Sequence, residues 1–228
     1  MDVHAMIINW PRQTARAEKL ETTIRPHVAR CDVLNSDTAA DRPGWQNLGD
    51  AYGTEQFIAA RRLAQHDLVL LVAADVSYED IPAILNRALD VMSRHPIGLY
   101  APNINWTAWR YDRAALGPPI EDDLYHVPET DGLVLFIRRE ILASLPCLDH
   151  TLNNFGWGID AALIAIAQAR NLWVCRDYAF TVKHPRGSGY DTNDAARQMQ
   201  NWIARQNPGL RADIKRVLRT AIAKRVEG

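Results

Sequence analysis

The sequence predicts an α/β protein in which a mixed, mostly parallel sheet is flanked by helices. The first third of the chain alternates short apolar runs with stretches of helical periodicity, the pattern of strand and helix units around a parallel sheet. One run, Leu68 to Ala74, is apolar throughout, as expected for a strand that is buried on both faces. No interior stretch is rich enough in Gly, Ser or Pro to act as a linker, so we expect the 228 residues to form one domain.

The first hundred residues are the most regular part of the chain and are expected to form the first half of the domain. Strands are predicted at 3–9, 31–34 and 68–74, and helices at 12–28, 53–64 and 78–94. The third helix is expected to begin at Ser77, with Glu79 and Asp80 in its first turn, where negative charge suits the helix dipole.

Residues 101–190 are expected to form the second half of the domain, and 191–228 to form closing helices. Strands are predicted at 97–100, 133–137, 173–175 and 180–183, and helices at 138–145, 160–170, 194–205 and 211–226. The stretch 102–127 is polar, aromatic and irregular, and a long irregular segment inside a compact domain is usually functional.

Composition narrows the classes of partner. The formal net charge of −1 gives no overall attraction to nucleic acid or to an anionic membrane. The N-terminus lacks the pattern of a secretory signal and no stretch is apolar enough to cross a bilayer, so we expect a cytoplasmic protein. Three widely spaced cysteines, Cys31, Cys147 and Cys175, argue against a disulfide framework and are each expected to be small core residues.

Asp75 directly follows the most apolar predicted strand. In an open parallel sheet, ligands bind beyond the carboxyl ends of the strands. A carboxylate there needs a cation or hydrogen-bond donors, so a divalent metal is one interpretation. A second interpretation is that Asp75 only caps the turn before the next helix.

Two motifs in the second half complete the set of candidate residues. Gly156-Trp157-Gly158-Ile159-Asp160 opens a predicted helix, and its acid is either a functional carboxylate or an ordinary acid at a helix start. His184-Pro185-Arg186-Gly187-Ser188-Gly189-Tyr190 follows the last predicted strand. It offers a metal-binding imidazole, a forked donor for phosphate and an aromatic face, although it also fits a plain surface loop.

The order and spacing of these motifs resemble the A-type (GT-A) fold of nucleotide-sugar glycosyltransferases, a Rossmann-like fold, over nearly the whole chain. Exact matches are confined to Asp75, 156–160 and 184–190. The resemblance is to family 2 glycosyltransferases and to the Gly-Trp-Gly acidic motif of the β-1,4-galactosyltransferases. Many such enzymes carry Asp-any-Asp at the end of this strand, whereas this sequence has Ala73-Ala74-Asp75 and lacks the first acid.

The resemblance implies that residues 1–100 are a nucleotide-binding half and that 101–190 are an acceptor and metal half. For the metal and the acceptor, it assigns roles to three residues. Asp75 and His184 would hold a divalent ion, Mn²⁺ or Mg²⁺, that grips the donor diphosphate. Asp160 would be the catalytic base of an inverting transfer, taking the proton of the acceptor hydroxyl. Relatives often have two adjacent acids here, whereas Asp160 is followed by Ala161.

For the sugar, acceptor and donor contacts, the resemblance assigns further residues. Contacts to sugar or acceptor are expected from the following residues: Asp131, Gly132, Trp157, Gly158 and Tyr190. Contacts to the donor nucleotide are expected from a second set: Asn9, Trp10, Asp37, Ala74 and Arg186. Turn formation explains Asp131, Trp10 and Asp37 nearly as well.

Aromatic residues gather in the irregular part and in the acidic motif: Trp106, Trp109, Tyr111, Tyr125 and Trp157. Such a cluster suits a carbohydrate acceptor, a plain core, or stacking on single-stranded nucleic acid. The scarcity of basic residues in this stretch makes a nucleic-acid acceptor the weakest of the three.

The last predicted helix is amphipathic and basic. It repeats apolar residues at Ile214, Leu218 and Ile222 among Lys and Arg residues. This pattern indicates a helix packed on the domain or, as the alternative, a peripheral contact with an anionic membrane.

The sequence therefore predicts a metal-dependent glycosyltransferase that moves a sugar from a nucleotide-diphosphate donor to a carbohydrate or other hydroxyl acceptor. Two alternatives remain open. One is a nucleotidyl- or phospho-sugar transferase, which would use the metal without needing Asp160. The other is a non-catalytic nucleotide- or sugar-binding module derived from the same fold.

Overall fold

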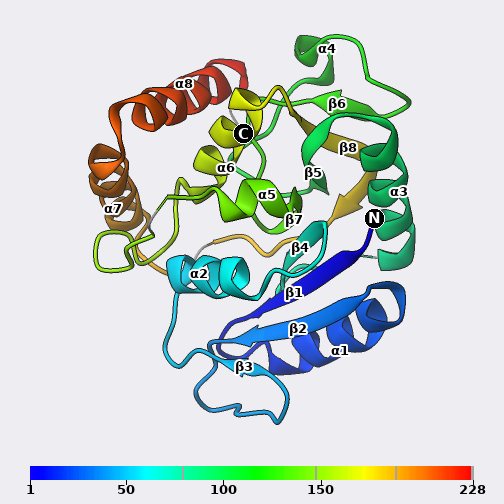
Figure 1. Ribbon diagram of the computed structural model, residues 1–228, viewed down its shortest axis with the longest axis vertical. Helices are drawn as coiled ribbons and strands as arrows, with labels where there is room; N and C mark the ends of the chain where they lie inside the picture. Colours follow the sequence, from blue (N-terminus) through cyan, green and yellow to red (C-terminus); the bar gives the residue numbers. More distant parts are fainter. Residues whose placement is uncertain (79, 147, 188, 227–228) are drawn as a thin grey trace.

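The computed structural model describes residues 1–78, 80–146, 148–187 and 189–226. Within these residues eight strands form one sheet in the order β3-β2-β1-β4-β7-β5-β8-β6 (Figure 1). The strands are β1 (Val3–Asn9), β2 (Arg30–Asn35), β3 (Gln46–Asn47), β4 (Leu68–Ala73), β5 (Ile97–Ile104), β6 (Leu124–His126), β7 (Val134–Arg138) and β8 (Trp173–Val182). The helices are α1 (Thr14–Ile24), the 3₁₀ turn η1 (Arg25–His27), α2 (Gly53–Leu63), α3 (Ile81–Arg94), α4 (Arg113–Leu116), α5 (Arg139–Ala143), α6 (Ile159–Ala169), α7 (Thr192–Arg205) and α8 (Pro208–Lys224).

The predicted mixed sheet is confirmed. Strand β1 pairs in parallel with β2 and β4, β2 pairs in parallel with β3, and β5 pairs in parallel with β8. Strand β7 runs antiparallel between β4 and β5, and β6 is antiparallel to β8 at one edge. The carboxyl ends of β1, β2 and β4 therefore lie together at one edge of the sheet.

Helices cover both faces of the sheet, and each face has its own apolar core (Figure 1). On one face, α1 and α3 pack residues such as Leu20 and Leu85 against alternate positions of β1 and β4. On the other face, α2, α5 and α6 contribute to the second core, with Trp202 of α7 and Ile214 of α8. All residues of β1 and β4 are buried, because helices lie above and below these strands.

Two helices begin later than the sequence pattern predicts. Arg12 has φ 72°, which is outside the helical region, and α1 starts only at Thr14. The predicted start of α3 at Ser77 is wrong, because the backbone of Ser77 pairs with Lys183 in an isolated bridge. Asp80 is the cap instead, since its side chain accepts a hydrogen bond of 2.9 Å from the backbone N of Ala83.

The irregular region is shorter than predicted. Strand β5 continues to Ile104, and the following residues include α4 and β6. The two strands predicted at 173–175 and 180–183 are one strand, β8, whose pairing with β5 shifts register between Pro102 and Asn103. A bulge of this kind interrupts the alternation of apolar residues, which explains the split in the prediction.

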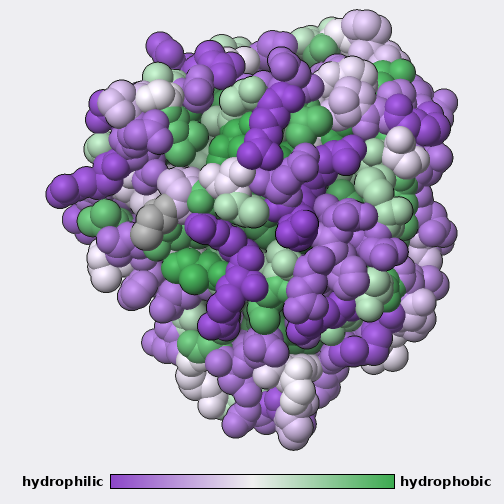
Figure 2. Space-filling model, viewed as in Figure 1, coloured by the Kyte–Doolittle hydropathy of each residue, from purple (hydrophilic) through white to green (hydrophobic). Residues whose placement is uncertain are grey.

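Cys31 and Cys175 are free and buried, as predicted for core residues, whereas Cys147, Glu79 and Ser188 lie outside the described residues. In the part of the chain that the structure describes, no helix combines the length and apolarity needed to cross a bilayer. On the face drawn in Figure 2, hydrophilic side chains predominate and apolar ones form small, separate areas.

Candidate functional site

Asp75 and His184 face each other at the carboxyl end of the sheet. Oδ2 of Asp75 lies 3.4 Å from Nε2 of His184. Oδ1 of Asp75 is buried and has no hydrogen-bond partner. Both side chains are partly exposed, at 22% and 17%. An anionic oxygen without a partner beside a neutral or cationic imidazole is an arrangement that a cation from solution can complete.

The backbone explains why residues from β4 and β8 meet. Ser77 and Lys183 exchange two backbone hydrogen bonds of 2.8 and 2.7 Å, which hold the chain after β4 beside the chain after β8. The backbone N of His184 also donates to Oδ1 of Asn105 at 2.8 Å. On the other side, Nη1 of Arg16 donates to the backbone O of Asp75 at 3.3 Å. These hydrogen bonds therefore hold in place the two loops that carry Asp75 and His184.

Asp160 lies in the first turn of α6, as predicted. Its Oδ1 accepts a hydrogen bond of 2.8 Å from the backbone N of Ala161. Burial is the main cause that raises the pKa of Asp160 to about 7; the charge of Asp131 contributes to the increase, and backbone hydrogen bonds oppose it. A carboxylate with this pKa can both lose and accept a proton near neutral pH, which is the property that a general base requires.

Asp131 lies close to Asp160, in the segment before β7. Burial raises its pKa as well, although Arg176 and a hydrogen bond from Oγ1 of Thr107 act in the opposite direction. The charge of His184 also lowers this pKa. Gly132, the next residue, would place a Cβ 3.7 Å from the ring of Phe57.

Glu129 is a site residue that the sequence interpretation missed. Its side chain is fully buried, and neither carboxyl oxygen has a hydrogen-bond partner. Burial raises its pKa well above the usual range, and the charges of Asp160 and Asp131 add to the increase. The available signal was its spacing, because residues two apart in an extended segment lie on the same side, and Glu129 is two residues before Asp131. We call Glu129, Asp131 and Asp160 the inner acids.

Arg176 is the buried cation near the inner acids. From β8 its Nη1 donates to the backbone O of Trp109, and its Nη2 donates to Oγ1 of Thr130 at 3.3 Å. Its guanidinium lies 5.4 Å from the centre of the Tyr111 ring. These contacts fix the guanidinium, whose charge lowers the pKa of both Glu129 and Asp131.

Steric constraints explain why positions 156 and 158 of the acidic motif are glycines. Gly156 has φ +77°, and a Cβ there would lie 3.0 Å from the backbone of Gly53. Gly158, the N-cap of α6, has φ +82°, and its Cβ would lie 2.9 Å from Cγ of Met199. Thr54 at the start of α2 donates from its backbone N to the O of Asn154 at 3.2 Å. The loop before α6 therefore packs closely against the start of α2, and the close contact with a positive φ favours glycine at position 156.

The predicted donor residues lie at the ends of β1 and β2. Asn9 is fully buried, and its Nδ2 donates to Oδ1 of Asn35 at 2.8 Å, so its side chain ties two strand ends together. Asp37 accepts from the backbone N of Arg12 at 3.1 Å and from Oγ1 of Thr14 at 3.2 Å. The Arg12 hydrogen bond holds the pKa of Asp37 below its usual value. Both side chains thus shape the turns around Trp10, which is partly exposed.

Three other predicted residues have defined surroundings. Ala74 is buried, and its backbone N donates to the O of Ile8 at 2.9 Å. The Arg186 guanidinium lies 5.7 Å from the centre of the Trp106 ring. Nε1 of Trp157 donates to the hydroxyl of Tyr190 at 2.8 Å, which joins the two motifs of the second half.

The predicted aromatic cluster is not a single surface. Tyr111 is buried in the core, Trp109 packs on that core, and Tyr125 pairs with Tyr178 in the β6 and β8 region. Trp106 is 39% exposed. Trp106, Trp109 and Tyr111 lie between β5 and β6, whereas Tyr125 belongs to β6, so the stretch that the sequence pattern presented as irregular is divided between a loop and a strand.

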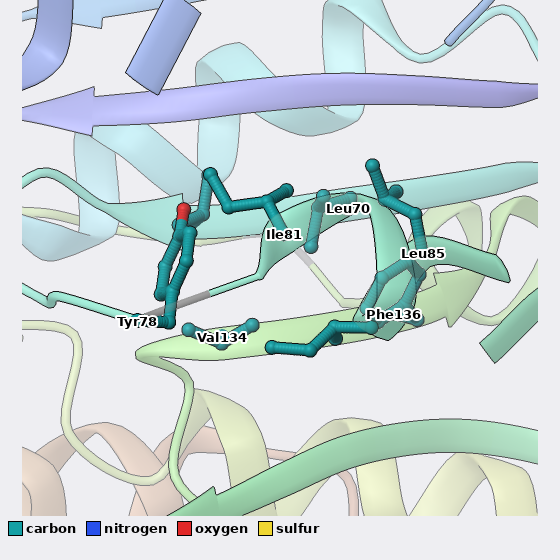
Figure 3. Close-up of a pocket in the computed structure, with 8 residues that line it drawn as sticks. Leu70, Tyr78, Ile81, Leu85, Val134 and Phe136 are labelled. Carbon is teal, nitrogen blue, oxygen red and sulfur yellow. The ribbon is translucent and has the colours of Figure 1, made fainter. Parts of the chain in front are cut away.

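A small cavity lies between α3 and strands β4 and β7 (Figure 3). Its volume is about 10 Å³, and its lining is apolar apart from the hydroxyl of Tyr78. This space holds at most one water molecule, so it is a packing defect and not a ligand site. Among the described residues, no group of three or more His, Cys, Asp or Glu side chains is arranged to hold a metal.

Comparisons with known proteins identify the fold. No family model matches the chain, and no curated protein matches it in sequence. Solved structures do match. Glucosyl-3-phosphoglycerate synthase from Mycobacterium tuberculosis, solved with Mn²⁺, UDP-glucose and phosphoglyceric acid, superposes with a TM-score of 0.60 at 16% identity, covering 94% of this chain and 80% of that one.

A mannosyltransferase from Pyrobaculum calidifontis, solved with GDP-mannose and Mn²⁺, superposes with a TM-score of 0.59 at 14% identity. That match covers 98% of this chain and 73% of the mannosyltransferase. The chain has the GT-A fold. The fold predicted from the sequence is therefore confirmed, whereas identities this low leave the activity and the site residues to be argued from the geometry.

Proposed function

We propose that this protein is a glycosyltransferase that moves a sugar from a nucleotide-diphosphate donor to a hydroxyl group of an acceptor. The observation that carries the proposal is the placement of Asp75 and His184 beside the inner acids at the carboxyl end of a GT-A sheet. The superposed glucosyl and mannosyl enzymes hold UDP-glucose or GDP-mannose with Mn²⁺, which supports a nucleotide-sugar donor here.

The residues fit a divalent metal. Oδ1 of Asp75 is buried without a partner, and Oδ2 lies beside Nε2 of His184. Carboxylate oxygen suits Mg²⁺ and Mn²⁺, and imidazole is a common metal ligand. Two protein ligands leave positions for diphosphate oxygens and water. When bound, the ion would supply positive charge for the departing diphosphate.

For the chemical step, we assign Asp160 as the base of an inverting transfer. Its position at the start of α6 and its pKa of about 7 suit proton removal from an acceptor hydroxyl near neutral pH. Arg186 is proposed to support the diphosphate, and Asp131 and Gly132 are proposed to contact sugar hydroxyls. Trp10, Asp37 and Ala74 form the proposed nucleotide end.

The location and the membrane contact are further parts of the proposal. Free, buried thiols at Cys31 and Cys175 are consistent with a reducing compartment, so we propose the cytoplasm. Helix α8 exposes Lys215, Arg219 and Ile222, which suits a peripheral contact with anionic lipid. Co-sedimentation with phosphatidylserine vesicles, lost in Lys215→Glu/Arg219→Glu, tests that contact.

The experiment for the donor is a thermal-shift series with UDP, GDP, CDP, dTDP and their common sugars, with and without Mn²⁺, on wild type and on Asp75→Ala. A ligand at a hundred times its Kd stabilises the fold by about 2.7 kcal/mol. We expect a Mn²⁺-dependent increase in Tm with one nucleotide, and its loss in Asp75→Ala. The absence of any shift across the series in wild type would overturn the proposed function.

A further inference from the structure

Four aromatic rings form a continuous row beside the proposed base. Tyr52 packs edge-on against Phe155 at 5.5 Å between ring centres, and Phe155 stacks on Tyr190 at 4.6 Å with an interplanar angle of 23°. Tyr190 contacts Trp157 at 6.3 Å. We call Tyr52, Phe155, Tyr190 and Trp157 the aromatic row.

The row joins the two ends of the proposed site. Tyr52 lies 6.5 Å from the ring of Trp10, the residue after β1. At the other end, Trp157 precedes Asp160 by three residues. Burial raises the pKa of the Tyr190 phenol, and the charge of Asp160 adds to the increase, so this ring lies near the proposed base.

The rings are both held in place and accessible. The hydrogen bond between Trp157 and Tyr190 and the backbone contact between Thr54 and Asn154 connect the three segments that carry them. Tyr52 is 36% exposed, and the other three rings are partly exposed. Aromatic faces that are fixed before binding lose little conformational entropy when a ligand packs on them.

The segments that carry most of the row contain no Lys or Arg. Neither 43–60, with Tyr52, nor 140–169, with Phe155 and Trp157, includes a basic residue other than His150. Nδ1 of His150 is paired with Oε1 of Glu55 at 4.0 Å. On the third segment, Arg197 is paired with Asp194, and Arg186, whose guanidinium lies over the Trp106 ring, is assigned to the donor diphosphate and not to the acceptor. A phosphorylated acceptor would meet carboxylates and aromatic rings here instead of the cations that bind phosphate.

We propose that the aromatic row is the binding surface for a neutral saccharide acceptor, whose sugar ring stacks on Tyr52 beside Phe155 and whose hydroxyl reaches Asp160. Pyranose rings present apolar C–H faces that pack on aromatic planes. The inference rests on the proposed glycosyltransferase function and specifies its acceptor class. It separates this chain from the superposed synthase, whose structure holds phosphoglyceric acid. Nucleobases also stack on aromatic rings, but binding of a nucleic-acid backbone needs basic residues that these segments lack.

The test measures acceptor binding directly, by saturation-transfer NMR with Mg²⁺ and UDP or GDP present. The probes are cellobiose, maltose and 1,4-mannobiose, compared with 3-phosphoglycerate and a thymidine tetranucleotide. We expect wild type to bind at least one disaccharide and neither charged probe. Tyr52→Ala should weaken disaccharide binding about fivefold, whereas Tyr52→Phe should keep it.

The matched control is Ile58→Ala, which removes an exposed apolar side chain (37% exposed) from the same helix outside the row. It should bind disaccharide as wild type does. Equal affinity in wild type and Tyr52→Ala, preference for either charged probe, or binding of no probe would each overturn the inference. Disaccharide binding through the row without any nucleotide binding would instead leave the surface in place and remove the proposed transferase function.

Discussion

The Asp75 and His184 pair and the inner acids lie at the same end of the sheet but differ in surroundings. The first pair is partly exposed and includes a buried oxygen without a partner. Among the inner acids, Glu129 is fully buried while Asp131 and Asp160 are partly exposed, and desolvation raises the pKa of all three. The difference teaches that one group is suited to binding positive charge from solution and the other to holding and releasing protons.

The largest expected effect comes from a mutation that removes the proton-accepting group and leaves the proposed metal-binding pair unchanged. Asp160→Asn keeps the size of the side chain and its hydrogen bond from Ala161 but removes the base, so sugar transfer should fall about a thousandfold. Nucleotide release in a coupled assay measures the rate.

The same variant should keep the Mn²⁺-dependent thermal shift with nucleotide, whereas Asp75→Ala should lose it. Full transfer activity in Asp160→Asn would contradict the assignment of the base and favour a nucleotidyl- or phospho-sugar transferase. Nucleotide binding without turnover in wild type would favour the non-catalytic module.

A second prediction concerns the loop that places Asp160. Gly156→Ala combines a positive φ with a Cβ 3.0 Å from the backbone of Gly53, so we expect a loss of about 3 kcal/mol in unfolding free energy. Gly49→Ala is the matched control, because Gly49 has φ +73° and nothing within 4 Å of its Cβ. That control should lose only about 1 kcal/mol.

Urea denaturation of both variants gives the comparison. The excess loss in Gly156→Ala measures the contact between α2 and the loop before α6. If the two variants lose the same stability, the contact does not hold the loop, and the enclosure of Asp160 needs another explanation.

A third, smaller effect is the pH dependence of the rate. Because the base acts when ionised and its pKa is about 7, kcat should fall about tenfold for each pH unit below that value. Asp131→Asn removes a negative charge that raises the pKa of Asp160, so the midpoint of the profile should move to lower pH. An unmoved midpoint would show that Asp131 and Asp160 do not interact.

The same pKa shift has a consequence for stability with a defined sign. The pKa of Asp160 is higher in the folded protein than the ordinary value of 3.8, so the folded state binds the proton more tightly. Its stabilising contribution is complete below pH 3.8 and is lost as the pH rises to about 7, a change of roughly 4 kcal/mol. Unfolding free energies measured across this range should decrease less steeply in Asp160→Asn, while Glu129 still contributes a slope of the same sign.

The sequence was informative wherever position along the chain implied position in space. Asp75 follows an apolar strand, Asp160 starts a helix and His184 follows the last strand, so their approach could be anticipated from a sheet whose strand ends meet at one edge. Glu129 could not be anticipated in the same way, because the sequence does not show whether an acidic residue is buried or at the surface. Only the tertiary structure shows that no donor reaches its oxygens.

The errors in the element boundaries also have local causes. Ser77 and Asp80 are both good helix caps, and the choice between them depends on the bridge from Ser77 to Lys183, a residue far along the chain. The aromatic row was missed because Tyr52 and Phe155 belong to segments that only the fold brings together.

The contact between α2 and the loop before α6 also determines when the site can form during folding. Thr54 and Asn153, which meet there, are 99 positions apart in the chain. Closing such a long loop costs conformational entropy before the contact returns any stabilisation, so contacts of this range form late. The loop before α6 therefore needs both halves of the chain to become ordered. The recovery of enzymatic turnover during refolding would measure when both halves have folded.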